Sequence, residues 1–371
     1  MDKLLDFIKN HSLTASVLSA IAIGYLFNQY TLHASLGEYN IENSLSNKRR
    51  FPIRIKKLII YPIKSCKGIE VRECKLDKYG IVNDRRFMLT LGESFISQKA
   101  FPRIGLITPR FSEDGKQLIV SAPGMEDLVI SAEPLQTDSL DKSRLKKIKL
   151  HHDDATVYEC SPETSQWFSR FLQVENVKFV QIPPQEDYHR PIRKSIALNL
   201  NKDNLSQYEH AFCNSAPIMI MSQASLDELN MRIDETRLSK NEQLTDDLTE
   251  DRFRPNILLV NTLPFEEDEW KTFRINHPDG KDINFTFGDQ NGRCPITTID
   301  QTKATFDPTE EPLRTLKTFR LTKCALGEKT LVGMYAVHSE IFNGYEIKVG
   351  STLDIIDKGF TSQYFTKVNI I

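Results

Sequence analysis

The sequence lacks an excess of charge of either sign, because 48 Lys and Arg residues nearly balance 50 Asp and Glu residues and leave a formal net charge of −2. Without a general basic field, the chain is not expected to bind nucleic acid. Cysteine is also sparse, with no C-x-x-C pair and no nearby histidine set at zinc spacing. We therefore expect free thiols in a reducing compartment at all six cysteines, Cys66, Cys74, Cys160, Cys213, Cys294 and Cys324.

The first part of the chain lacks charged side chains over a long run. No Asp, Glu, Lys or Arg occurs in residues 10–37. A helix over about residues 12–30 is just long enough to span a bilayer, and the basic cluster Lys48-Arg49-Arg50 behind it would stay in the cytosol. A cleaved secretory signal is the alternative, but acidic residues offset the lysines at the start. We expect residues 1–50 to form an N-terminal signal anchor and its linker, with a helix lying in the membrane interface as a further alternative.

The composition of the chain is typical of a globular protein, and we assign residues 51–371 to its folded body. Its 371 residues are too many for one ordinary core, and 40% hydrophobic and 26% charged residues exclude disordered and fibrous classes. Short apolar runs separated by Gly and Pro turns indicate a sandwich or barrel rather than βαβ units. We predict a β-dominated α+β protein with two domains, residues 51–187 and 188–371.

Two helices have clear start signals. Ser161 followed by Pro162 provides a cap and a proline at the first helical position. Ser222 or Ser225 caps a second helix, which directly follows a strand over residues 218–221. The sequence contains no internal repeat and no low-complexity tract.

A lone cysteine lies in the segment Asn291-Gly292-Arg293-Cys294-Pro295-Ile296-Thr297-Thr298-Ile299-Asp300. Asn-Gly and Pro favour a tight turn, and the β-branched residues that follow predict a strand over 296–299. Such a turn could present the sulfur of Cys294 to a ligand. The alternative is that Cys294 is a small hydrophobic residue at the end of a core strand.

Two other segments, Tyr61-Pro62-Ile63-Lys64-Ser65-Cys66-Lys67-Gly68 and Phe253-Arg254-Pro255-Asn256-Ile257, precede the cysteine segment in the chain. Together the three resemble the MOSC family of molybdenum-cofactor proteins, and especially its membrane-anchored branch of mitochondrial amidoxime reducing components. The resemblance extends from about Arg54 to about Ile356. It implies a MOSC-type N-terminal β-barrel domain over 51–187 and a MOSC β-barrel domain over 188–371, with the cofactor between them.

The resemblance also implies a function. The family reduces N-hydroxylated compounds such as amidoximes with a molybdenum-molybdopterin cofactor, and it receives electrons from a b-type cytochrome and its NADH-dependent reductase. The absence of flavin, haem and nicotinamide motifs agrees with electrons that arrive from partners. The implied location is the mitochondrial outer membrane, with the body facing the cytosol. The alternatives are a cofactor carrier, a sulfurase-like MOSC protein without pyridoxal phosphate, or a non-catalytic membrane-held subunit.

The cofactor carries a phosphate, a polar pterin and a soft metal, so its site needs cations at one end and a sulfur ligand at the other. Cys294 matches the family's molybdenum ligand, and the positive charge of Arg293 beside it favours the thiolate. Pro255 biases Arg254 toward extended geometry, which would aim Arg254 and Asn256 at one ligand. Arg86 matches an arginine that reaches the cofactor in the family, and its neighbour Arg85 is the alternative for that position. No residue of the sequence is assigned as the proton donor. The expected cofactor-binding residues are Lys64, Ser65, Arg86, Ser215, Ala216, Arg254, Asn256, Gly292 and Arg293.

Overall fold

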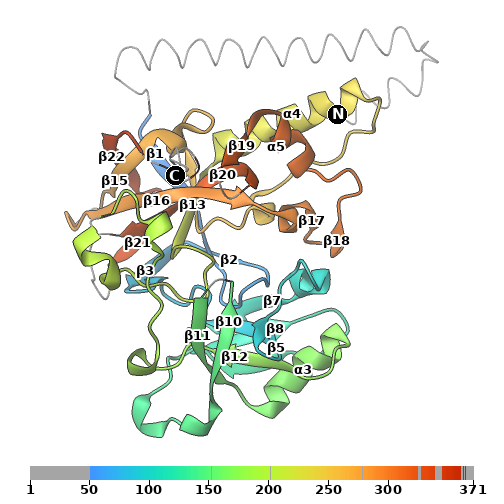
Figure 1. Ribbon diagram of the computed structural model, residues 1–371, viewed down its shortest axis with the longest axis vertical. Coiled ribbons are helices and arrows are strands. Elements are labelled where there is room, and N and C mark those ends of the chain that lie inside the picture. Colours follow the sequence, from blue (N-terminus) through green and yellow to red (C-terminus); the bar gives the residue numbers. More distant parts are fainter. Residues whose placement is uncertain are drawn as a thin grey trace, which may run out of the picture. The chain divides into compact units, whose positions relative to one another are not determined.

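The computed structural model describes residues 51–364 apart from 152, 201, 278, 325–326, 339–344, 361 and 363. The signal anchor predicted for residues 1–50 lies outside this part of the chain. Among the described residues, none of the helices has the length and apolar character needed to cross a bilayer. The described residues from Ile53 onward belong to one compact unit, and strands dominate it, as predicted (Figure 1).

The larger sheet closes on itself because β20 pairs with both β16 and β13. Its inward faces carry apolar side chains that are almost completely buried, such as Leu58, Ile257 and Phe285. A strand from the start of the body, β1, lies between two strands from the second half of the chain. The sheet contains β13 (Ile218–Ser222), β14 (Ile257–Val260), β1 (Ile53–Ile60), β22 (Thr352–Lys358), β15 (Trp270–Ile275), β16 (Ile283–Arg293), β20 (Gly327–His338), β19 (Leu321–Cys324) and β2 (Ile69–Val71).

A second, smaller sheet forms a closed barrel of five strands. Helix α3 (Pro162–Leu172) packs on it, and Figure 1 shows the helix beside β12. The Ser161 hydroxyl accepts a hydrogen bond from the Thr164 amide, so the predicted cap is confirmed. The barrel strands are β10 (Leu145–Leu150), β11 (Asp153–Glu159), β12 (Val177–Gln181), β5 (Phe87–Leu91) and β6 (Ser94–Phe95).

Three small sheets complete the strand inventory of the described residues. They comprise β7 (Thr108–Phe111), β8 (Gln117–Ser121) and β9 (Leu128–Ser131); β21 (Glu346–Lys348), β3 (Glu73–Asp77) and β4 (Gly80–Ile81); and β17 (Ile299–Asp300) with β18 (Thr305–Phe306). The prediction of a β-dominated α+β fold with two barrels is thus confirmed. The domain boundary near Asp187 stays a prediction.

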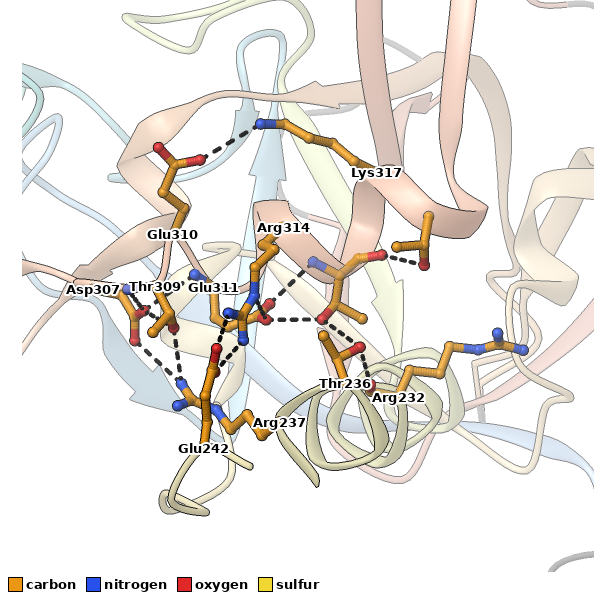
Figure 2. Close-up of polar contacts among 12 residues, drawn as sticks. Arg232, Thr236, Arg237, Glu242, Asp307, Thr309, Glu310, Glu311, Arg314 and Lys317 are labelled. Atoms are coloured by element: carbon orange, nitrogen blue, oxygen red, sulfur yellow. Dashed lines mark hydrogen bonds and ion pairs between the residues drawn. The ribbon is translucent and has the colours of Figure 1, made fainter. Parts of the chain in front are cut away.

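Helices α4 (Gln223–Ser239) and α5 (Leu313–Phe319) pack against each other and against the larger sheet. Of the two caps that the sequence allowed, the structure has Ser222, whose hydroxyl accepts a hydrogen bond from the Ser225 amide. Figure 2 shows a charged network on these helices, in which Arg314 bridges Glu242 and the fully buried Glu311. The network ties the loop after α4 to the start of α5.

Candidate functional site

A cleft of about 420 Å³ is lined by residues from both closed sheets and from the loops between them. A cavity of this size is ordinary for a cofactor or substrate site. We call it the cleft, and its lining residues are Lys64, Ser65, Arg85, Phe95, Ser97, Gln98, Lys99, His151, Cys213, Asn214, Ala216, Met219, Arg252, Phe253, Arg254, Asn256, Asn291, Gly292, Arg293, Cys294, Ile296, Thr297 and Tyr335.

The charged side chains that line the cleft are lysines and arginines. No Asp or Glu occurs among the described residues that line the cleft. Two of the guanidinium groups have a buried nitrogen without a hydrogen-bond partner in the described part of the chain, Arg252 Nη1 and Arg254 Nη2. Because such a nitrogen is costly to leave unpaired, these atoms point to an anionic ligand. The cationic lining residues are Lys64, Arg85, Lys99, Arg252, Arg254 and Arg293.

Lys64 is held in the cleft wall by the loop that follows β1, and it is only 6% exposed. Its Nζ donates to the Phe212 carbonyl oxygen at 2.8 Å and to Asn214 Oδ1. Burial lowers the pKa of Lys64 well below its ordinary value, and the nearby Arg190 adds to the effect. No carboxylate hydrogen-bonds to this ammonium group in the described structure, so an anion in the cleft would favour its charged form.

Arg254 differs from its expected conformation. Its φ is +58°, in the left-handed region rather than the extended one, so the expectation based on Pro255 was wrong. The guanidinium lies over the Tyr61 ring at 4.2 Å, and Arg85 lies over the same ring at 4.6 Å. Tyr61 also donates to the Pro255 carbonyl oxygen at 3.2 Å, and these contacts hold the backbone in place. Burial lowers the pKa of Arg254.

Asn256 lines the cleft, but its amide group is fully used inside the protein. Its Nδ2 donates to Asp84 Oδ1 at 2.9 Å and to the Ile59 carbonyl oxygen at 3.1 Å. Its Oδ1 accepts from Arg85 Nη1 at 3.0 Å and from the Met219 amide at 3.1 Å. The residue is completely buried, so the geometry makes it a brace between strands that positions Arg85.

Cys294 lies at the end of a strand, not in a turn that opens one. Residues 291–293 continue β16, and a 3-10 helix, η9 (Pro295–Thr298), occupies most of the predicted strand 296–299. Both expectations were wrong because Gly292 and Arg293 pair with Leu331 and Thr330 of β20 after a register shift at Asn291, so the chain does not reverse here. The Cys294 side chain is exposed, which excludes the alternative of a packed core cysteine. Its sulfur is therefore available to a ligand in the cleft.

Arg293 is anchored by backbone acceptors. Its Nε donates to the Val332 carbonyl oxygen at 2.9 Å and its Nη1 to the Phe253 carbonyl oxygen at 3.0 Å. Burial lowers the pKa of Arg293 to about 10. Nearby, Tyr335 Oη donates to Asn291 Oδ1 at 2.9 Å, and this pair joins β20 to β16 at the cleft wall.

The structure brings eight of the ten predicted site residues into one cavity. Ser215 is not among the lining residues, although its neighbours Asn214 and Ala216 are. Arg86 turns away and pairs with Asp77 at 2.7 Å, and its place in the cleft is taken by Arg85.

The sequence did not single out several other lining residues. His151 comes from the tip of the β10–β11 hairpin, and its Nε2 lies 2.9 Å from Asn214 Oδ1. Partial desolvation lowers the pKa of His151 to about 4, and the charge of Lys64 adds to this effect, although the side chain reaches the surface. Arg252 directly precedes the segment Phe253-Arg254-Pro255-Asn256. Its position beside a recognised motif is the feature of the sequence that could have indicated a place in the cleft. No comparable signal marked His151, because a hairpin tip is far from every motif in the chain.

Comparison with known proteins places these features in a family. Residues 52–175 match the MOSC N-terminal beta barrel domain, and residues 207–354 match the MOSC domain. The chain is 30% identical over 304 residues to mitochondrial amidoxime reducing component 2 of Bos taurus, a match that covers 80% of this chain and 81% of that protein. It is 31% identical to the Rattus norvegicus protein of the same name, over 76% of this chain and 78% of that one. A molybdenum cofactor sulfurase 2 of Culex quinquefasciatus is 27% identical over 82% of this chain but only 37% of its own length.

Proposed function

The chain belongs to the MOSC family, and we propose that it is a molybdenum-cofactor enzyme that reduces N-hydroxylated compounds such as amidoximes. The observation that carries the proposal is the exposed thiol of Cys294 on a cleft whose charged lining is entirely cationic. A soft sulfur donor and an anion-binding wall are the two features that a molybdopterin cofactor requires. The names of the relatives support the choice of reaction.

The residues present fit this cofactor. Cys294 Sγ would be the metal ligand, and Arg254 would meet the phosphate or pterin with the Nη2 that has no partner in the described structure. Lys64 and Arg293 would add positive charge to the same wall. When bound, the cofactor supplies the two-electron redox chemistry.

The reduction of an amidoxime to an amidine breaks the N–O bond, consumes two electrons and two protons, and releases water. The protein must therefore bind the N-hydroxy group near Cys294 and provide protons. Tyr335 lines the same wall, and burial raises its pKa, so its hydroxyl keeps a proton at neutral pH. We propose Tyr335 Oη as the group that holds a proton for the leaving hydroxyl.

The remaining parts of the proposal follow from the resemblance. A b-type cytochrome and its NADH-dependent reductase would supply the electrons. The location would be mitochondrial, as the names of the relatives suggest, with residues 1–50 anchoring the body to the cytosolic face of the outer membrane. A second candidate function is cofactor carriage or a sulfurase-like role, which the similarity to the mosquito sulfurase supports.

The test is to purify the full chain from a molybdenum-replete host and to measure bound molybdenum, bound pterin and the reduction of benzamidoxime by reduced methyl viologen. We expect stoichiometric cofactor and steady formation of benzamidine. A chemical reductant removes the need for a protein electron donor. Absence of pterin and molybdenum would contradict the proposal, whereas a loaded protein that reduces no N-hydroxylated compound would favour the carrier.

A further inference from the structure

Arg252 is a cation of the cleft to which the sequence analysis assigned no role. It ends a 3-10 helix, η7 (Glu250–Arg252), directly before the segment that carries Arg254. It lines the cleft, and its Nη1 is buried without a hydrogen-bond partner in the described part of the chain. A buried guanidinium nitrogen without an acceptor is a strong site for an oxyanion.

The two carboxylates whose charges act on Arg252 pair with other side chains. Asp300 and Asp307 act on its charge, but Asp300 pairs with Lys303 at 3.4 Å and Asp307 with Arg237 at 3.6 Å. Neither aspartate lines the cleft. The guanidinium therefore keeps its capacity for a bidentate contact with a ligand.

Arg252 lies on the side of the cleft that carries Cys294. Its 3-10 helix, η7, packs against η9, which begins at the residue after that cysteine. A ligand that contacts Arg252 thus also lies close to the proposed metal ligand, where a substrate must bind.

We propose that Arg252 forms a subsite for an anionic substituent of the substrate, so that N-hydroxylated compounds bearing a carboxylate are preferred over uncharged ones. This inference rests on the proposed function. The ligand of Arg252 is an oxyanion, which is either a carboxylate of the substrate or the phosphate of the cofactor. The position of Arg252 favours the substrate, since η7 packs against the helix that begins directly after Cys294.

The test compares the parent full chain with Arg252→Gln, Arg252→Lys and, as a matched control, Arg110→Gln. Arg110 is an exposed arginine that pairs with Asp127 on a small sheet away from the cleft. For each protein we would measure bound pterin, kcat/KM for benzamidoxime and for its para-carboxylate, and the Kd of benzoate by calorimetry.

For Arg252→Gln we expect bound pterin equal to the parent, a fall of about tenfold in the ratio of kcat/KM for the carboxylate to that for the uncharged compound, and a rise of about tenfold in the benzoate Kd. Arg252→Lys should give intermediate values, because it keeps the charge but loses the planar fork. The Arg110 control should match the parent.

Two results would overturn the proposal. An unchanged ratio together with an unchanged benzoate Kd would show that Arg252 binds no substrate anion. A loss of pterin in Arg252→Gln would place the residue at the cofactor phosphate instead. If no compound is reduced by any of the proteins, the proposed function fails, and the benzoate Kd still decides whether Arg252 binds a carboxylate.

Discussion

Replacement of Cys294 by serine tests whether its sulfur is a metal ligand. Cys294 is exposed, whereas Cys74 is 6% exposed and packs in the core of the larger sheet. A substitution at an exposed position usually changes the free energy of unfolding by no more than about 0.5 kcal/mol. A serine hydroxyl buried without a partner costs about 1–3 kcal/mol, so Cys74→Ser is the matched control for structure.

The two variants should respond in opposite ways. Cys294→Ser should leave the melting temperature within a degree or two of the parent, since about 1 kcal/mol shifts it by roughly 2–4 °C in a domain of 150–250 residues. Its reduction of benzamidoxime should fall by more than about 100-fold, because even changes to the outer partners of a metal ligand cost roughly 10–100-fold. Cys74→Ser should melt several degrees lower and keep its activity per molecule of bound cofactor.

The assay measures melting temperature, bound pterin and turnover with reduced methyl viologen on one preparation of each protein. Pterin should largely remain in Cys294→Ser, since Lys64, Arg254 and Arg293 are unchanged. Full turnover of Cys294→Ser per bound molybdenum would refute the assignment of the ligand. A large fall in its melting temperature with unchanged turnover would show that the residue is structural.

Three further predictions concern the cleft and its supports. Arg254→Lys should lower bound pterin with little change in melting temperature, because a lysine ammonium cannot reproduce the planar guanidinium that presents Nη2. Equal pterin content in the variant and the parent would remove Arg254 from the site. Glu311→Gln should lower the free energy of unfolding by about 1–3 kcal/mol, because the fully buried Glu311 carboxylate accepts a hydrogen bond from Arg314 Nε at 2.8 Å. Thermal unfolding of the variant and the parent would detect this loss. His210 is 1% exposed, and burial holds its pKa well below 6.5. The contribution of the neutral imidazole to the free energy of unfolding is therefore fully present above about pH 6.5 and is lost as the pH falls below that value. Urea titrations should show a flatter pH dependence of this free energy in His210→Gln, and an identical pH dependence would exclude this histidine as the cause.

Local patterns in the sequence determined much of the fold. The Ser161 and Ser222 caps are local, because a side-chain hydroxyl reaches the amide three residues ahead whatever surrounds it. Short apolar runs bounded by turn residues indicated the β-dominated class, and the strand predicted over residues 218–221 is present. The resemblance identified eight of the 23 residues that line the cleft, including the exposed Cys294.

Tertiary contacts decided what the patterns left open. Asn291-Gly292 reads locally as a turn, but the segment pairs with β20 and extends β16, because sheet partners distant in sequence outweigh the local preference.

Arg85 and Arg86 are chemically identical neighbours, and only their surroundings distinguish them. Asp84, Asn256 and the Tyr61 ring hold Arg85 at the cleft, while Asp77 draws Arg86 away from it. Which carboxylate each of these two arginines meets is a property of the assembled structure rather than of the sequence around it.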